Sequence, residues 1–410
     1  MKWKEFLHRI KKINYKMIMA VIFLVCVIIV GSVTFPFTME HIGLMLTKTN
    51  SYYNAALTAE RVDKSYQEML DFDRFGLQDK GFYINLYGLI ARIIGQRYIN
   101  ERIKLDNGHL TEETEYQDTW FAAVQMKKLY DRQKEKGKDF LFIMAPNQVP
   151  KYRDIMPAGY VNVSNGNADE LMDALRDTEV PALDLRDVMY DEGLSHEEAF
   201  FVTDHHWKPE TGLWSIKKII ETLTQAGTIG PVDPMYTNIE EYDVEVHEKI
   251  FLGSFGRRTG VFFAGIDDFS VITPRFETDF SVYLPYSETE MHGSFRDMLI
   301  DESKLEVKFF ESNPYVVYGH AEEGLIQYRN ENAPVDLKVL AIGDSFSHVS
   351  YIWLPLIFKT CDQIDMRYIE EDFEKHYADF DPDIVLVMVN PKQVVMENTT
   401  YDFFNENILH

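Results

Sequence analysis

Three short runs of apolar residues constrain the fold of this chain more than any other feature of its sequence. They lie within Asp139–Gln148, Leu337–Gly343 and Pro382–Asn390, and each is bounded by turn or charged residues. Apolar runs of this length, without alternating polar residues, are typical of strands that are buried on both faces, as in a parallel sheet. Such a sheet must be covered by helices on both sides, so we predict an α/β fold.

Helical patterns before and between these runs support that prediction. Glu112–Lys138 carries an approximate apolar stripe, and a second helix is predicted to start at Pro209. Proline is favoured in a first helical turn, and the apolar residues after it recur with the period of an amphipathic helix. A third helix is predicted at His348–Thr360, followed by a further strand at Gln363–Ile369. The segment Tyr83–Tyr98 fits either a buried helix or a pair of strands.

Residues 231–334 interrupt this alternation. They are rich in Phe, Tyr, Asp and Glu, and they contain short strand-like runs at Gly260–Gly265 and Phe269–Pro274. We expect an insertion with β structure that rims the functional site.

An uncharged apolar segment at Met17–Phe37 predicts a membrane anchor. About twenty apolar residues suffice to cross a bilayer as a helix. Basic residues precede the segment, which favours a cytoplasmic segment 1–16 and an extracytoplasmic body. A cleaved signal peptide is the competing interpretation, but the run is long and lacks a clear Ala-x-Ala site. We therefore expect a single-pass protein of the cell membrane.

The net charge of −25 restricts the partners that the body can bind. Because the first sixteen residues are predominantly basic, the remainder is even more acidic. It should repel nucleic acid and anionic lipid surfaces, whereas a neutral or cationic partner such as a glycan fits. A purely solubilising role for the charge stays open. Cys26 and Cys361 lie in no metal or redox motif, and no cofactor is expected.

The triplet Gly343-Asp344-Ser345 is the first candidate for chemistry. It lies between a predicted buried strand and a predicted helix, so Ser345 is expected at the carboxyl edge of the sheet, where ligands bind in open α/β folds. A serine nucleophile needs a base within hydrogen-bond reach and donors for the developing oxyanion, and a following helix would offer its positive end. The alternative is an ordinary turn with Ser345 as a helix N-cap.

The cluster Asp204-His205-His206 is the second candidate. An Asp-x-His spacing lets one carboxylate hold one imidazole in the required tautomer. The cluster follows an apolar segment and precedes the helix at Pro209, which predicts that it lies at the same sheet edge as Ser345. In this interpretation His206 is a general base oriented by Asp204, with His205 as the alternative base.

Two other interpretations of the cluster stay open. The first is a metal site completed by His196, Asp184 or Asp187, although no recognisable ligand spacing is present. The second is a purely structural role for the histidines in capping and packing.

Together the two motifs resemble a known family. VTDHHW at residues 202–207, followed more than a hundred residues later by AIGDSF at 341–346, resembles the bacterial DHHW family, which is similar to the SGNH-hydrolase-like alginate O-acetyltransferase proteins. The resemblance spans about residues 80–395. It implies a three-layer αβα, flavodoxin-like domain in which the Asp-x-His element precedes the serine, a circularly permuted order.

Under this resemblance the chain divides into five parts. These are a cytoplasmic segment 1–16, an anchor 17–37, a membrane-proximal segment 38–110 and a catalytic domain 111–410 with the insertion 231–334 inside it.

The resemblance also implies roles for individual residues. Ser345 matches the nucleophile, His206 the base and Asp204 its orienting acid. Asn390 lies where the superfamily has its oxyanion asparagine, although Pro-Lys follows it here.

Further candidates for substrate or oxyanion binding lie in two loops. The superfamily's oxyanion glycine would follow Gln363–Ile369, and none is present there. The stretch FLGSFGRRTG also resembles the family, and its Gly253, Gly256 and Arg258 are candidate donors, with surface charge as the alternative for Arg258. Asn147 in APNQ is a further candidate, with a turn role as its alternative.

The resemblance implies a serine-dependent O-acetyltransferase that modifies a cell-surface polysaccharide through an acyl-serine intermediate. It also implies a membrane-bound O-acyltransferase partner that delivers acetyl groups across the bilayer. A carbohydrate acetylesterase with the same triad and a non-catalytic glycan-binding subunit are the alternatives. Transfer and hydrolysis differ in how well water is excluded, and the sequence does not show that.

Overall fold

The computed structural model describes residues 21, 23–25, 28, 77–320, 323–369, 372–394 and 402–404. Contacts divide the chain into two compact units, Met1–Lys80 and Gly81–His410. Of the predicted anchor at 17–37, the few described residues are helical, and the rest lies outside the described residues, as do segment 1–16 and residues 38–76. Among the helices that are described, none combines the length and the hydropathy needed to span a membrane.

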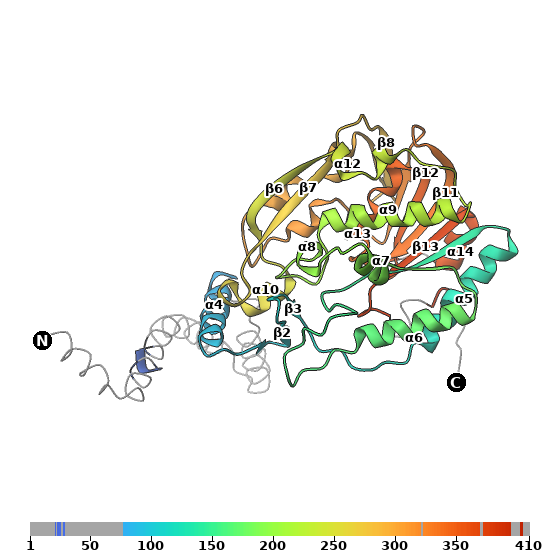
Figure 1. The fold of residues 1–410 in the computed structure, drawn as a ribbon. Coiled ribbons are helices and arrows are strands. Elements are labelled where there is room, and N and C mark those ends of the chain that lie inside the picture. Colours follow the sequence, from blue (N-terminus) through green and yellow to red (C-terminus); the bar gives the residue numbers. More distant parts are fainter. Residues whose placement is uncertain are drawn as a thin grey trace, which may run out of the picture. The chain divides into compact units, whose positions relative to one another are not determined.

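A mixed sheet forms the centre of the unit Gly81–His410 (Figure 1). Within the described residues it has eight strands in the order β5-β4-β13-β11-β12-β10-β8-β9. In chain order they are β4 (Asp139–Met144), β5 (Ala182–Asp184), β8 (Phe280–Leu284), β9 (Thr289–Gly293), β10 (Leu325–Arg329), β11 (Val335–Gly343), β12 (Phe358–Asp365) and β13 (Ile384–Val389). From β5 to β12 neighbouring strands are parallel, whereas β10, β8 and β9 continue the sheet with antiparallel pairs. The predicted parallel sheet is thus confirmed for its central strands.

Strand β13, at the centre of the sheet, is apolar throughout because both of its faces are buried. In β13 the alternate residues from Ile384 to Met388 belong to the core on one face, and those from Val385 to Val389 belong to the core on the other. Every residue of this strand is buried. Successive side chains of a strand point to opposite faces, so a strand covered on both sides needs an apolar residue at each position.

Helices cover both faces of the sheet (Figure 1). α9 (Pro209–Gln225) and α13 (His348–Tyr351) contribute to the core on one face. α5 (Trp120–Glu135), α6 (Ser164–Asp177) and α14 (Phe373–Phe380) contribute to the core on the other face. This arrangement confirms the predicted α/β class with helices on both sides of the sheet.

Further elements complete the described part of the chain. They are α4 (Leu77–Ile93), β1 (Tyr98–Ile99), β2 (Arg102–Lys104), β3 (Leu110–Thr111), α7 (Leu185–Asp191), α8 (His196–Ala199), β6 (Tyr242–Phe251), α10 (Ser254–Thr259), α11 (Val261–Ala264), β7 (Asp267–Pro274) and α12 (Phe295–Leu299). Short 3₁₀ helices lie at η1 (Pro234–Tyr236), η2 (Ile239–Glu241), η3 (Glu302–Leu305), η4 (Pro314–Val317) and η5 (Leu354–Leu356). Strands β6 and β7 pair with each other, so the region 231–334 supplies both this ribbon and the antiparallel edge of the main sheet.

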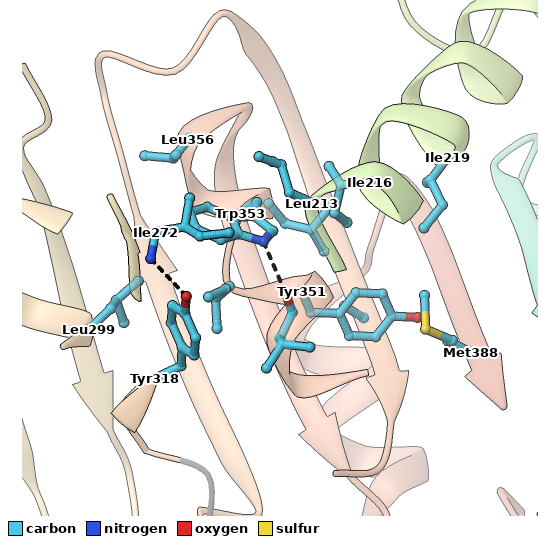
Figure 2. Close-up of a cluster of buried hydrophobic side chains, with 14 of the residues drawn as sticks. Leu213, Ile216, Ile219, Ile272, Leu299, Tyr318, Tyr351, Trp353, Leu356 and Met388 are labelled. Carbon is cyan, nitrogen blue, oxygen red and sulfur yellow. Dashed lines mark hydrogen bonds between the residues drawn. The ribbon is translucent and has the colours of Figure 1, made fainter. Parts of the chain in front are cut away.

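Helix α9 follows directly from its sequence. Pro209 occupies the first turn, where the missing N–H costs no hydrogen bond. Leu213, Ile216 and Ile219 lie on the buried side, and Figure 2 shows them pointing into the core. The chain turns away after the helix at Gly227, whose φ of 77° suits a residue without a side chain.

The core below α9 holds large aromatic side chains whose polar atoms are hydrogen-bonded (Figure 2). The Trp353 indole N–H donates to the Val349 carbonyl at 2.9 Å. The Tyr318 hydroxyl accepts from the Ile272 N–H at 2.9 Å and donates to the Ser270 carbonyl at 3.0 Å. A buried polar group without a partner destabilises the folded state, so these hydrogen bonds remove the cost of burying the polar atoms of Trp353 and Tyr318.

Two segments have a different start or a different secondary structure from the one predicted, and in both the difference lies at a turn formed by aspartate or glycine. The helix predicted from Glu112 begins only at Trp120, because the Asp118 carboxylate accepts the Trp120 N–H at 2.8 Å in a local turn. The strand-like run Gly260–Gly265 is instead the helical turn α11. Its flanking glycines have φ values of 87° and 91°, which end the helix on both sides.

The helix predicted at His348–Thr360 is also shorter than expected. α13 ends at Tyr351, and β12 already begins at Phe358. Pro355 lies between them in the 3₁₀ helix η5. Proline has no N–H for a continuing α-helix, so the chain changes direction there. The ambiguous segment Tyr83–Tyr98 is mainly helical, as part of α4.

Replacing Tyr318 with Phe should destabilise the protein. The substitution leaves the Ile272 N–H and the Ser270 carbonyl without a partner in a water-free core. We expect a loss of about 1–3 kcal/mol in the free energy of unfolding, seen as a lower urea midpoint. Tyr283→Phe, at a ring that is 38% exposed on β8, is the matched control. Equal midpoints for the two variants would contradict this assignment.

Candidate active site

Ser345 lies in a tight turn immediately after β11. The Phe346 N–H donates to Asp344 Oδ1 at 2.6 Å, and the Ser347 N–H donates to the Asp344 carbonyl at 3.1 Å. Asp344 and Phe346 are buried, whereas Ser345 is half-buried. The turn therefore presents the Ser345 hydroxyl at the carboxyl edge of the parallel strands, where open α/β sheets place their ligands.

His206 joins this hydroxyl to Asp204. The Nε2 atom of His206 lies 3.1 Å from Ser345 Oγ, and its Nδ1 atom lies 2.6 Å from Asp204 Oδ1. A carboxylate only accepts hydrogen bonds, so Nδ1 carries the proton and Nε2 is the acceptor that faces the serine. The structure thus brings Asp204 and His206 to Ser345, which lies 141 positions after Asp204 in the sequence.

The carboxylate of Asp204 is buried and hydrogen-bonded through both oxygens. Oδ1 also accepts the backbone N–H of His206 at 3.0 Å, and Oδ2 accepts that of Ser254 at 2.5 Å. Burial alone would raise the pKa of this carboxyl, but the neighbouring imidazoles of His205 and His206 and the Ser254 N–H hold the pKa well below its usual range. Asp204 is therefore ionised and able to orient His206.

A second buried carboxylate, that of Asp267, stabilises the backbone next to Asp204. Asp267 accepts hydrogen bonds from the Val202 N–H at 3.0 Å, the Thr203 N–H at 2.8 Å and the Thr203 hydroxyl at 2.7 Å. The same hydroxyl accepts the Gly253 N–H at 2.8 Å. These bonds fix residues 202–204 against the start of α10, which positions the Ser254 N–H that binds Asp204.

Aromatic rings hold the His206 imidazole in place. The Tyr315 ring stacks on it with centroids 4.0 Å apart and planes inclined by 16°. The Tyr315 hydroxyl donates to the Ser345 carbonyl at 3.2 Å, and the Trp207 indole N–H donates to the Phe346 carbonyl at 3.0 Å. Tyr315 therefore contacts both His206 and Ser345. Neither Tyr315 nor Ser254 was a candidate from the sequence, since no motif surrounds Tyr315 and Ser254 acts through its backbone.

His205 lies beside the pair and does not face the serine. Its Nδ1 atom lies 3.0 Å from Ser254 Oγ, and its ring centroid lies 3.7 Å from that of His206. Burial and the neighbouring imidazole lower the pKa of His205. The geometry therefore favours His206 over His205 as the base.

The metal interpretation has one candidate cluster among the described residues, formed by Asp204, His205 and His206. His206 Nδ1 and both Asp204 oxygens already take part in hydrogen bonds within the protein. The suggested completing residues act elsewhere. Asp184 caps α7, and Asp187 pairs with Lys151 at 2.8 Å. This arrangement fits a hydrogen-bonded triad better than a set of metal ligands.

Asn390 lines a small polar pocket of about 60 Å³ together with His205. Its Nδ2 atom donates to Gln393 Oε1 at 2.7 Å, and its Oδ1 atom accepts the Lys392 N–H at 3.0 Å. The side chain therefore stabilises its own turn, and an oxyanion role would fall to the second N–H of Nδ2.

Asn147 lines the same pocket and also stabilises a turn. It donates to Ser164 Oγ at 3.0 Å and accepts the Val149 N–H at 3.0 Å. The preceding strand β4 thus ends in a turn whose shape depends on this side chain.

The candidates in FLGSFGRRTG mainly position the triad. The N–H of Gly253 donates to Thr203, and that of Gly256 donates to the Thr203 carbonyl at 2.8 Å. A Cβ atom at Gly253 would lie 2.5 Å from Asp204 Oδ2, so only glycine allows this approach. Arg258 is exposed.

The backbone N–H of Ser345 is the donor that the structure leaves available. No acceptor for it occurs among the described residues. It lies next to the hydroxyl, which is the position that an oxyanion hole requires. The predicted helix dipole contributes little, because α13 has only four residues.

The structure has an α/β fold with a mainly parallel central sheet, and part of the chain is similar to SGNH-hydrolase-like domains. Residues 107–249 match a family described as the SGNH hydrolase-like domain of acetyltransferase AlgX. No curated protein sequence matches significantly.

Solved structures agree with this classification. PatB1 of Bacillus cereus matches with a TM-score of 0.60 at 18% identity, covering 74% of this chain and 99% of that chain. The same protein with a sulfonyl adduct matches with 0.58 at 16% identity, covering 73% and 98%. A DHHW family protein from Eubacterium siraeum matches with 0.57 at 17% identity, covering 74% and 95%. The resemblance to the DHHW and AlgX-type proteins is thus confirmed, and at these identities the solved structures establish the shared fold. The circularly permuted motif order stays a prediction.

Stability should fall in mild acid because of His348, which is buried three residues after Ser345. Burial lowers the pKa of His348 to about 4, and its Nε2 atom bonds the Tyr318 carbonyl. The pKa of a histidine in the unfolded chain is about 6.5. Below that pH His348 is protonated in the unfolded chain but stays neutral in the folded protein. The stabilisation is therefore complete above pH 6.5 and is lost towards pH 4, by up to about 3 kcal/mol. Urea midpoints between pH 7 and 4.5 should fall less steeply for His348→Gln; parallel slopes would contradict this.

Proposed function

We propose that this chain is an extracytoplasmic, serine-dependent O-acetyltransferase that modifies a cell-surface polysaccharide through an acyl-serine intermediate. The observation that carries the proposal is the alignment of Ser345, His206 and Asp204, with distances of 3.1 and 2.6 Å between successive partners. The match of residues 107–249 to an acetyltransferase family supports acetyl as the acyl group.

In the first half-reaction Ser345 Oγ attacks the carbonyl carbon of an acetyl ester. His206 Nε2 takes the hydroxyl proton, and the ionised Asp204 stabilises the imidazolium that forms. The tetrahedral oxyanion is placed to accept the Ser345 N–H. The intermediate then collapses. The bond to the leaving oxygen breaks, His206 returns the proton to that oxygen, and acetyl-Ser345 remains.

In the second half-reaction a hydroxyl of the glycan replaces the leaving group. His206 removes its proton while the hydroxyl oxygen attacks the acetyl-serine carbonyl. Collapse releases the O-acetylated glycan and returns the proton to Ser345. The stacked Tyr315 ring and the Phe346 ring cover part of His206. Transfer prevails over hydrolysis if the bound acceptor excludes water from the acetyl-serine.

A membrane-bound O-acyltransferase partner is proposed as the source of acetyl groups, with residues 17–37 as the anchor. The apolar segment would hold Ser345 near such a partner, which raises its effective concentration without any new contact. The acidic charge of the body keeps the domain away from anionic lipid head groups.

A carbohydrate acetylesterase is the second candidate, because the same triad accepts water if the site stays open. Ser345 is half-buried, so water reaches its hydroxyl before an acceptor binds. Added oligosaccharide decides between the two. Acetylated product that grows at the expense of free acetate indicates transfer. A non-catalytic glycan-binding subunit would hydrolyse no ester at all.

The triad is tested with p-nitrophenyl acetate. Ser345→Ala and His206→Ala should each lower hydrolysis by about a thousandfold or more, because nucleophile and base act as a unit. His205→Ala should retain activity within about tenfold, since its ring does not face Ser345. A sulfonyl fluoride should label Ser345, as read by peptide mass. Activity that survives Ser345→Ala, or that is lost with a metal chelator, would overturn the serine mechanism.

Gly253→Ala tests how the triad is positioned. The new Cβ atom would meet Asp204, displace its carboxylate and disturb His206. We expect at least about a hundredfold loss of ester hydrolysis with little change in overall fold. Gly166→Ala in α6 is the matched control, because no heavy atom lies within 4 Å of its Cβ position. Full activity of Gly253→Ala would show that Asp204 does not depend on this close approach.

A further inference from the structure

We propose that a second pocket binds a neutral sugar ring of the acceptor glycan, stacked on Tyr152 and Tyr190. The pocket has a volume of about 260 Å³, and its lining includes Tyr152, Arg153, Tyr190, Leu194, His196 and Glu197. We call it the tyrosine pocket. The inference deepens the proposed function and rests on it in one respect, namely that the acceptor is a glycan.

The tyrosine pocket adjoins the candidate active site through one loop. Asn147 and Gln148 begin the loop after β4 and line the small polar pocket beside His205. Gln148 Nε2 donates to the Asp204 carbonyl at 2.8 Å. His196 of the tyrosine pocket interacts with the backbone of Asn147. An extended chain whose hydroxyl reacts at Ser345 can therefore continue along this loop to the tyrosines.

The two tyrosine rings are exposed, close together and held in place. Tyr152 is 53% exposed and Tyr190 is 63% exposed, with ring centroids 4.5 Å apart and planes inclined by 47°. The Tyr152 hydroxyl donates to Asp187 Oδ1 at 2.6 Å, which fixes its ring. The axial C–H groups of a pyranose carry partial positive charge and fit the negative face of an aromatic ring. Because the ring is already ordered, stacking on it costs little conformational entropy.

The charges around the tyrosine pocket favour a neutral ligand. Lys151 pairs with Asp187 at 2.8 Å, and Arg153 pairs with Glu197 at 2.5 Å. Arg186, the remaining Lys or Arg side chain of the lining, is paired with acidic groups as well. No cation of this lining is left unpaired, so a phosphate or carboxylate would find no excess positive charge. Arg153 and Glu197 can still exchange hydrogen bonds with sugar hydroxyls at the rim.

The size of the tyrosine pocket suits one ring. Pockets that enclose drug-sized ligands have volumes of about 300–1,000 Å³. At about 260 Å³ this pocket is slightly smaller. It therefore fits a subsite that holds one residue of a longer chain, while the reacting residue lies at Ser345.

Binding is tested on the full-length chain carrying Ser345→Ala, so that no turnover occurs. Calorimetry with N-acetylglucosamine oligomers and with cello-oligomers of up to six rings gives the dissociation constants. We expect the longer oligomers of at least one series to bind, and Tyr152→Ala/Tyr190→Ala to weaken that binding about tenfold or more. Tyr283→Ala on β8 is the matched control and should leave binding unchanged. Because all three tyrosines are exposed, urea midpoints should stay close to the parent value.

Turnover separates this proposal from the proposed function. With Ser345 intact, the double tyrosine variant should hydrolyse p-nitrophenyl acetate within about twofold of the parent, because neither ring touches the triad. If oligomer binding depends on the two tyrosines but the chain with Ser345 intact hydrolyses no ester, the acetyltransferase proposal is wrong and the tyrosine-pocket proposal is supported. Binding that ignores the two tyrosines, or no binding of either series, overturns the tyrosine pocket whatever the esterase activity.

Discussion

The hydrogen bonds to the buried carboxylate of Asp204 are the interactions on which the whole site depends. One oxygen holds the ring and the backbone of His206, and the other holds the backbone of Ser254. An ionised group in a buried position is costly unless it is hydrogen-bonded, so these segments must stay together in the folded protein. The approach of Gly253 to the same carboxylate and the bonds of Thr203 to Asp267 follow from this requirement.

The parallel sheet gives this network a rigid base. Because both faces of β11 and β13 are buried, the strands cannot shift without exposing apolar side chains. The turn after β11 therefore presents Ser345 at a defined position. The loop after β4 brings Gln148 to Asp204 and Tyr152 to the tyrosine pocket. A reacting group and a binding surface for an extended substrate can thus be held by neighbouring loops of one sheet edge.

Much of the candidate site could be predicted from the sequence because its residues occur in short, recognisable patterns. An aspartate two residues before a histidine, and a serine directly after a buried strand, indicate partners with opposite chemical roles. Tyr315 had no such pattern, since it lies in the short 3₁₀ helix η4 and reaches His206 only through the path of the folded chain. A turn role for Asn147 was already one of the two interpretations of its sequence. The turn that Asn390 stabilises was hidden, because a side chain's hydrogen-bond partners depend on neighbouring backbone geometry.

The sequence by itself determined the class of fold, because the continuous apolar runs Phe140–Met144, Val339–Ile342 and Ile384–Val389 indicate strands that are covered on both faces. It also determined the start of α9, since Pro209 and the residues after it follow helical rules that need no tertiary contact. The tertiary structure decided which imidazole faces Ser345 and which backbone N–H groups are already used. Those choices depend on how the region 231–334 wraps around the sheet edge, and a linear pattern does not record distances between segments that meet only after folding.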